Sequence, residues 1–370
     1  MFKELQEAFG HLEFSSVDKD FGNLISISAK EGISFGNQIS LPNNNLLFTL
    51  KVYEDTIPIN LFVEIDSSGN ILNILKETEG TMPEIFISPN DSVWSINTCL
   101  DDRKNMEIII PLLNRSEVKK EYKYRSFVGE WIGNIKNTVI FFNNDLFGKK
   151  PDQLCKLEFR ENTILKREIV KIRQPKMNKV HIDHQDSFQL LAWHDGKLLH
   201  RNINQKGEIL DERFLEVEEL NDVEVLRLSF ENNTDLIGFD NNLLFRISFT
   251  PNGDVIRKKL IELGPKSFFY TISTPIKINS KNYLIRFVGE NFNGWAVIDL
   301  DNVFECYICY KDSNSYKDIM SDKVIELPKS DENHFVISGV SVNNNETYQV
   351  TVYNSNQKEK AVNQLYIISR

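Results

Sequence analysis

The chain has 370 residues, with 43 Lys and Arg against 53 Asp and Glu, so its formal net charge is −10. Hydrophobic residues make up 41% and charged residues 26%, which are globular proportions and exclude a wholly disordered or collagen-like chain. The acidic balance argues against a general nucleic-acid binder, because such a protein neutralises phosphates with a basic surface.

The first residues predict a short amphipathic helix, since Phe2, Leu5, Phe9 and Leu12 follow one another at spacings of three and four. We expect residues 1–20 to form this helix and its lead-in. The segment has no uninterrupted apolar run of the kind found in secretory signals. No stretch of the chain reaches the ~18 consecutive apolar residues of a membrane span. The sequence therefore predicts a cytoplasmic protein that does not enter a membrane.

After this segment, short apolar or alternating runs are separated by turns rich in Asn, Asp, Gly and Ser, which is typical of an all-β chain. Residues 43–45 are all Asn, a residue that tolerates the left-handed backbone of tight turns. Two segments, 198–217 and 244–263, share a pattern of strand, Gly-containing turn and strand. Upstream, residues 190–196 match 236–242 at the same offset, so the shared unit spans about three strands.

The strands that follow these turns begin at a regular spacing along the chain. Their first residues are Ile71, Val118, Ile164, Ile209, Val255 and Val303. A period of about 46 residues with about four strands in each repeat is typical of a β-propeller. The chain thus resembles the β-propeller superfamily over nearly its whole length. The resemblance concerns architecture only, because the Trp-Asp dipeptide of WD repeats and the double Gly of kelch repeats are missing.

We predict a single β-propeller domain over residues 21–370, with seven four-stranded blades and six as the alternative. Seven repeats occupy about 322 residues and leave room for the N-terminal helix and an insertion near residues 311–331. Residues 334–369 supply only about three strands. We therefore expect an N-terminal strand to complete the last blade, a closure that pairs edges otherwise left open.

Four of the six histidines lie close together in one repeat: His181, His184, His194 and His200. Acidic residues such as Asp183 are interleaved with them, and imidazoles with carboxylates can bind metals or transfer protons. His181, Asp183 and His184 are the first candidates for a ligand site, because strand ends and their loops line propeller faces. However, a spacing of three on a strand puts two side chains on opposite faces. Exposed polar residues are the alternative, and no metal or cofactor is predicted.

The tetrapeptide Phe-Val-Gly-Glu occurs at residues 127–130 and 287–290, followed in each case by a tryptophan, Trp131 or Trp295. Paired aromatic loops could stack on sugar rings, so both tryptophans are candidate ligand-binding residues. Their separation does not fit the repeat period, and a coincidence of two strand ends is the alternative interpretation.

Two further motifs carry no chemistry in this context. Cys306 and Cys309 form a C-x-x-C, but no second pair completes a zinc site, and a strand would place the two thiols on opposite faces. Gly32–Gly36 fits G-x-S-x-G, yet no helix follows Ser34 as a nucleophile elbow requires.

Our main prediction is a non-enzymatic propeller that serves as a protein–protein interaction or scaffold module, with a protein as its partner. Fold alone does not fix function. The alternative is a carbohydrate-binding or carbohydrate-active propeller of the lectin or glycosidase kind. A third hypothesis is a metal-dependent hydrolase that uses the histidine-rich repeat. Nucleic acid and membrane are not expected partners.

Overall fold

The structure is a computed structural model, and it describes the greater part of the chain. The described residues are 13–19, 22–54, 57–66, 70–79, 84–89, 91–99, 106–111, 122–124, 130–143, 151–160, 163–172, 179–182, 186–194, 197–215, 225–230, 233–249, 255–265, 267–273, 275–299, 301–327, 335–342, 347–354 and 362–370.

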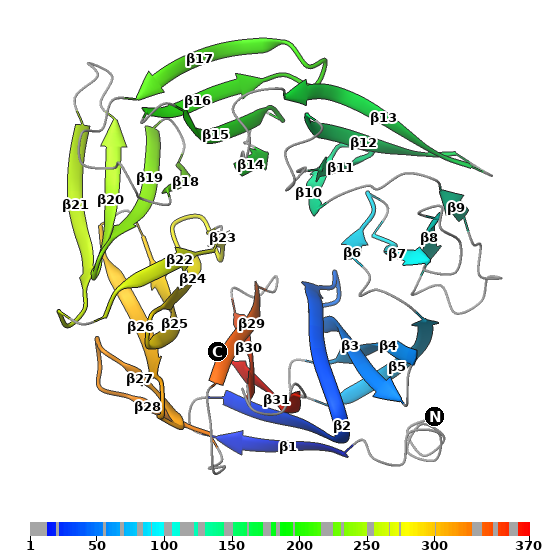
Figure 1. Ribbon diagram of the computed structural model, residues 1–370, viewed down its shortest axis with the longest axis vertical. Coiled ribbons are helices and arrows are strands. Elements are labelled where there is room, and N and C mark those ends of the chain that lie inside the picture. The colour runs from blue at the N-terminus through cyan, green and yellow to red at the C-terminus, as the bar shows by residue number, and fades with distance from the viewer. Residues whose placement is uncertain are drawn as a thin grey trace. The chain divides into compact units, whose positions relative to one another are not determined.

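Four of the sheets have four antiparallel strands each, paired in chain order (Figure 1). They are β6 (Glu84–Ile87), β7 (Val93–Cys99), β8 (Met106–Pro111) and β9 (Tyr122–Tyr124); β10 (Glu130–Ile135), β11 (Thr138–Asn143), β12 (Asp152–Arg160) and β13 (Thr163–Ile172); β14 (Lys179–Ile182), β15 (Phe188–His194), β16 (Lys197–Ile203) and β17 (Ile209–Leu215); and β18 (Val225–Phe230), β19 (Asn233–Asp240), β20 (Leu243–Phe249) and β21 (Val255–Glu262).

A fifth sheet has seven strands: β22 (Phe269–Ile272), β23 (Ile276–Lys277), β24 (Tyr283–Gly289), β25 (Phe292–Ile298), β26 (Val303–Tyr310), β27 (Ser315–Asp318) and β28 (Val324–Glu326). Its order is β22-β24-β25-β26-β27-β28, with β23 also paired to β24. The insertion expected near residues 311–331 thus contains two strands, β27 and β28, which extend this sheet beyond β26.

The sixth sheet has eight strands: β1 (Glu13–Lys19), β2 (Gly22–Ser40), β3 (Leu46–Glu54), β4 (Ile57–Ile65), β5 (Ile71–Glu79), β29 (Phe335–Val342), β30 (Tyr348–Asn354) and β31 (Val362–Ser369). The long strand β2 pairs with β31 through residues such as Leu24 and Ile27, and with β3 through residues such as Gln38 and Ser40. Strands from the beginning and the end of the chain therefore lie in one sheet.

These sheets confirm the predicted all-β class and the β-propeller fold. The predicted division into seven, or six, four-stranded blades is not confirmed, because β2 joins the strands of both chain ends into one sheet and β27–β28 enlarge another. The expected helix falls on residues 1–12, outside the described residues, while residues 13–19 of its lead-in form strand β1. No helix long and apolar enough to cross a membrane occurs among the described residues.

The chain divides into two compact units. The first comprises Met1–Pro83, Phe239–Arg246 and Lys258–Arg370, and the second Glu84–Gly238 and Ile247–Arg257. The single domain over residues 21–370 stays a prediction.

In the first unit, every residue of β25 is buried, as expected of a short apolar strand with both faces covered. One of its side chains, Trp295, belongs to a core cluster that also contains Tyr307 and Tyr316. In the second unit, one cluster gathers Phe86, Phe141 and Leu157, and another contains Phe188 and Leu190. Each unit thus has buried aromatic and aliphatic side chains of its own.

The predicted glycine turn between β16 and β17 is present. Gly207 has φ +86°, and a Cβ added there would lie 2.4 Å from the carbonyl oxygen of Ile169. Both the left-handed backbone and the close approach of β13 require glycine at this position.

Candidate functional site

The structure describes only part of the histidine-rich candidate site. His181 lies on β14, where its backbone pairs with Gln189 of β15. Asp183 and His184 lie outside the described residues. No group of three or more His, Cys, Asp or Glu side chains that could hold a metal ion occurs in the part of the chain that the structure describes.

His200, from the same repeat, is 3% exposed, and its Nε2 lies 3.1 Å from Oε1 of Gln189. The alternative interpretation of the histidines as exposed polar residues therefore does not hold for His200, which is an internal residue of β16.

The two candidate tryptophans lie in different compact units. Trp295 is fully buried: its ring stacks on Tyr307 with centroids 4.9 Å apart, and its Nε1 donates to the Tyr348 hydroxyl at 3.3 Å. In this position Trp295 packs in the core and offers no ring face to a sugar. Trp131 is half-buried on β10 and packs against the cluster that contains Phe141.

Cys306 and Cys309 are both buried free thiols on β26. Cys309 belongs to the Trp295 cluster, whereas Cys306 does not, in agreement with thiols on opposite faces of a strand. Burial raises the pKa of Cys309 to about 12 and also raises the pKa of Cys306. Both groups stay protonated near neutral pH, and metal binding and thiol exchange need the thiolate.

A polar network in the first unit links three strands. Glu305 on β26 accepts hydrogen bonds from the Tyr348 hydroxyl and, at 2.7 Å, from Nη2 of Arg370. The Arg370 guanidinium also lies 5.3 Å from the centre of the Tyr307 ring. Burial, followed by the charge of Glu305, raises the pKa of Tyr348, so its hydroxyl stays a donor. Glu305 is 43 residues away from Tyr348 in the sequence and 65 residues away from Arg370, so no local motif reveals the network.

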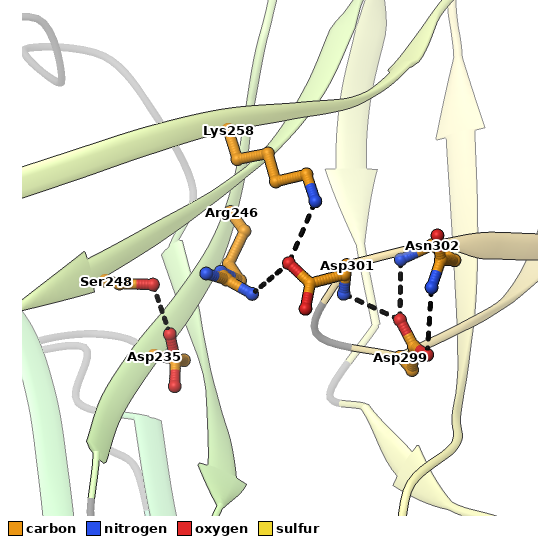
Figure 2. A network of polar contacts seen from close by, with 7 residues as sticks. All are labelled: Asp235, Arg246, Ser248, Lys258, Asp299, Asp301 and Asn302. Carbon is orange, nitrogen blue, oxygen red and sulfur yellow. Dashed lines mark hydrogen bonds and ion pairs between the residues drawn. The ribbon is translucent and has the colours of Figure 1, made fainter.

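Two lysines of β21, Lys258 and Lys259, pair with carboxylates, and Figure 2 shows the first of these pairs. Asp301 accepts from Lys258 Nζ at 2.8 Å and from Arg246 Nη1 at 3.3 Å. These contacts, with the Lys258 hydrogen bond first, hold the pKa of Asp301 below its usual value. Lys259 pairs with Glu262 at 2.5 Å. These lysines thus form local ion pairs on the strand face.

The turn that carries Asp301 is itself ordered by Asp299, whose Oδ1 accepts from the backbone N–H groups of Asp301 and Asn302. In the second unit, Asp235 accepts a hydrogen bond from Ser248 at 2.5 Å (Figure 2). Asp235 is 2% exposed, so this contact stabilises a buried carboxylate rather than presenting one to a ligand.

Several large apolar side chains are exposed on two of the sheets. On β17 they are Ile209, Leu210 and Phe214. On the seven-stranded sheet they are Phe304 of β26, Ile319 and Met320 in the turn between β27 and β28, and Val324 of β28. Sequence patterning missed both groups, because an apolar residue in a strand is read as a core residue. Exposed apolar groups on outer strands are typical of contact sites.

The register places two of these side chains, Ile319 and Val324, on one face. The Ile319 N–H donates to the Cys306 carbonyl at 2.9 Å, which sets Ile319 opposite Cys306. Ile308 pairs with Lys317, which pairs in turn with Val324. Side chains two apart on a strand, and directly opposite across strands, share a face. The pairing therefore puts Ile319 and Val324 on one face. Phe304 is the unpaired residue of a bulge in β26, since Glu305 pairs with Val297 and Val303 with Ile298. The exposed side chains of Phe304, Ile319 and Val324 are called the β26–β28 surface.

No protein-family model matches the chain, and no curated protein matches it. Among solved structures, the apo form of prolyl oligopeptidase B from Galerina marginata is 8% identical, with a TM-score of 0.50 over 90% of this chain. The match covers 57% of that peptidase, so this chain spans little more than half of its length.

Two other structures match nearly end to end. Virginiamycin B lyase from Staphylococcus aureus is 12% identical, with a TM-score of 0.39 over 96% of this chain and 98% of its own. The N-terminal domain of Nup159 is 14% identical, with a TM-score of 0.45 over 92% and 96%. At such identities the likeness concerns the fold alone.

Proposed function

We propose that the protein is a non-enzymatic β-propeller that serves as a protein–protein interaction or scaffold module. The β26–β28 surface carries this proposal. Phe304, Ile319 and Val324 are 49%, 41% and 47% exposed; they lie on β26, in the turn between β27 and β28, and on β28. Apolar side chains gathered on one exposed face are typical of a contact surface for another protein.

Buried groups hold this extension in place. Tyr316 on β27 is fully buried, and its hydroxyl donates to Asn293 Oδ1 at 2.6 Å. Asp318 accepts from the backbone N–H of Cys306 at 2.8 Å and of Met320 at 3.1 Å. A surface fixed in advance loses little conformational entropy when a partner covers it, which favours affinity.

Burial of these side chains by a partner would contribute favourably to the free energy of binding. Complete burial of a large aliphatic or aromatic side chain contributes about 1.5–3 kcal/mol, and about half of each of the three remains to be covered. Together they would contribute about 3 kcal/mol, enough to anchor a partner and too little to bind it alone. We expect polar contacts around the surface to supply the remainder.

The test is co-purification of the tagged full chain from its native host, followed by reconstitution with the identified partner. Ile319→Asp should weaken binding of the purified partner at least about tenfold, since it places a charge in the apolar contact. The matched control is Leu72→Asp, because Leu72 is 46% exposed on another sheet. Equal binding of both variants, or recovery of free chain only, would contradict the proposal.

Carbohydrate binding is the second candidate, and Tyr270, which is 62% exposed at β22, favours it. An exposed aromatic ring offers an apolar face with a polar hydroxyl. Burial of Trp295 removes one of the aromatic groups on which this candidate depended. A glycan array together with a panel of chromogenic glycosides distinguishes the two candidates, and uniformly flat signals would reject carbohydrate.

A further inference from the structure

The second group of exposed apolar side chains lies on a sheet edge. β17 ends the order β14-β15-β16-β17 and pairs only with β16 among the described strands. Every residue from Glu208 to Phe214 is exposed, including Ile209, Leu210 and Phe214 at 53%, 59% and 48%. An exposed edge strand with apolar side chains is a template on which another strand can pair.

The pairing register defines the regular part of this edge. Asp211 is opposite Asn202, Arg213 opposite His200, and the register shifts between Asn202 and Ile203. Leu210 is therefore the extra residue of a bulge, and Asp211–Leu215 is the stretch with regular strand geometry.

The edge strand β13, by contrast, is protected by charge. On β13, the half-buried or exposed positions include Lys166, Arg167, Glu168 and Lys171, and none of its side chains from Lys166 to Ile172 is an exposed large apolar group. Charged side chains, lysine above all, discourage pairing at a sheet edge. β17 has no lysine, and its charged side chains Asp211–Arg213 stand beside the exposed apolar residues Ile209, Leu210 and Phe214.

The charges on β17 indicate what kind of strand would pair with it. Glu208, Asp211 and Glu212 outnumber Arg213 on the exposed stretch, which is therefore acidic. Glu212 pairs with Arg201 of β16 at 2.5 Å and Asp211 with Arg213 at 3.5 Å, so the acidic excess is small. The sequence continues acidic with Glu216, Glu218, Glu219 and Asp222. Opposite charges facing each other across strands stabilise pairing, and like charges oppose it.

We propose that the edge of β17 binds an extended segment of a partner protein in which apolar residues alternate with Lys or Arg, by addition of a strand. Main-chain hydrogen bonds to Asp211–Leu215 would supply affinity, while Phe214 and the carboxylates would select the apolar and basic positions. This inference rests on the proposed function as an interaction module. Its residues differ from those of the β26–β28 surface, so the two can fail separately.

The probe is a fluorescent peptide of alternating Lys and Val, about ten residues long, which suits a strand. Fluorescence anisotropy with the full chain measures its binding, and hydrogen exchange reports protection of the β17 amides. We expect saturable binding that protects Asp211–Leu215. An alternating Glu–Val peptide should not bind, and methylation of alternate backbone nitrogens in the Lys–Val peptide should weaken binding at least about tenfold, because it removes strand-pairing donors.

Two variants locate the site on the chain. Phe214→Lys should weaken binding of the Lys–Val peptide about tenfold, whereas Ile256→Lys, at a residue 51% exposed on edge strand β21, should leave it unchanged. Circular dichroism checks that both variants are folded. If Phe214→Lys is unfolded, Asp211→Lys takes its place in the binding experiment. Three outcomes would each overturn the inference: no binding, binding insensitive to methylation, or protection outside β17. If the Lys–Val peptide binds as expected but Ile319→Asp leaves binding of the purified partner unchanged, only the β26–β28 surface is rejected.

Discussion

Arg370 donates to Glu305 through Nη2 and Oε1, 2.7 Å apart, and so fixes the residue that follows β31 to strand β26. The backbone of Arg370 also exchanges two hydrogen bonds of 2.8 Å with Tyr348. Glu305 accepts from the Tyr348 hydroxyl as well, so one carboxylate joins β26, β30 and the residue that follows β31. The side chains of Arg370 and Glu305 are only 14% and 27% exposed, which limits screening of their charges by water.

Removal of the carboxylate should therefore destabilise the fold. Glu305→Ala leaves the Arg370 guanidinium without its counter-charge and Tyr348 without its acceptor. We expect the free energy of unfolding to fall by about 2–3 kcal/mol, less than for a fully buried pair. Urea denaturation measures the change. Lys317→Ala breaks the exposed pair with Asp322 and is the control, with no measurable change expected. Equal effects of the two variants would contradict a structural role for Glu305.

Trp295 is expected to act as a core residue and not as a ligand contact. Trp295→Ala removes the stack on Tyr307 and the hydrogen bond to Tyr348, and leaves a cavity between them. Large-to-small substitutions of this kind lower the free energy of unfolding by about 3–5 kcal/mol. Trp295→Phe should recover most of the loss in thermal unfolding experiments. A stable Trp295→Ala variant that has lost affinity for a glycan would show the opposite role.

The sequence predicted the repeated hairpins well because alternation and turn residues are local signals. At residues 43–45 it predicted a tight turn, and Asn44 adopts φ 66° there. It could not show that Asn43 and Asn45 donate to Glu64, a buried carboxylate that also accepts from Asn73 at 2.5 Å. Such contacts depend on how the strands pair, and no short segment of the sequence determines that pairing.

The candidate sites were less predictable than the fold for a related reason. Trp295 follows a strand end in the sequence like an exposed loop residue, yet β25 is covered on both faces. Phe304 and Ile319 resemble core residues in sequence, but the sheet ends soon after them. Burial is set by the neighbouring strands, which the period of about 46 residues does not specify.

The thiols of β26 should show their burial chemically. Because burial raises the pKa of Cys309 to about 12, its thiol stays protonated at pH 8 in the folded chain. Iodoacetamide should leave Cys306 and Cys309 unmodified in native protein and modify both in urea, as read by mass spectrometry of their peptides. Rapid native alkylation of either residue would contradict the packing of β26.

The same shift has a consequence for stability. An unfolded thiol ionises above about pH 8.5, whereas the folded thiol of Cys309 keeps its proton up to about pH 12. Within this window the unfolded state binds fewer protons, so stability falls as pH rises, by about 1 kcal/mol per pH unit. Cys309→Ala should make this fall less steep in denaturation curves measured between pH 8 and pH 10, while Cys306, whose pKa burial also raises, keeps its own contribution. An unchanged slope would mean that Cys309 ionises alike in both states.

Gly207 offers a sharp test of the turn before β17. Gly207→Ala places a Cβ 2.4 Å from the Ile169 carbonyl oxygen in a backbone with φ +86°, so both sterics and backbone strain oppose it. We expect a loss of about 2 kcal/mol in the free energy of unfolding. Gly264→Ala is the matched control, since a Cβ there meets no atom within 4 Å. A Gly207→Ala variant as stable as the original chain would refute the close contact with β13.

The turn also sets the register of β17, because Gly207 N–H donates to the Asn204 carbonyl at 3.0 Å. Binding of the Lys–Val peptide should therefore weaken in Gly207→Ala and persist in Gly264→Ala.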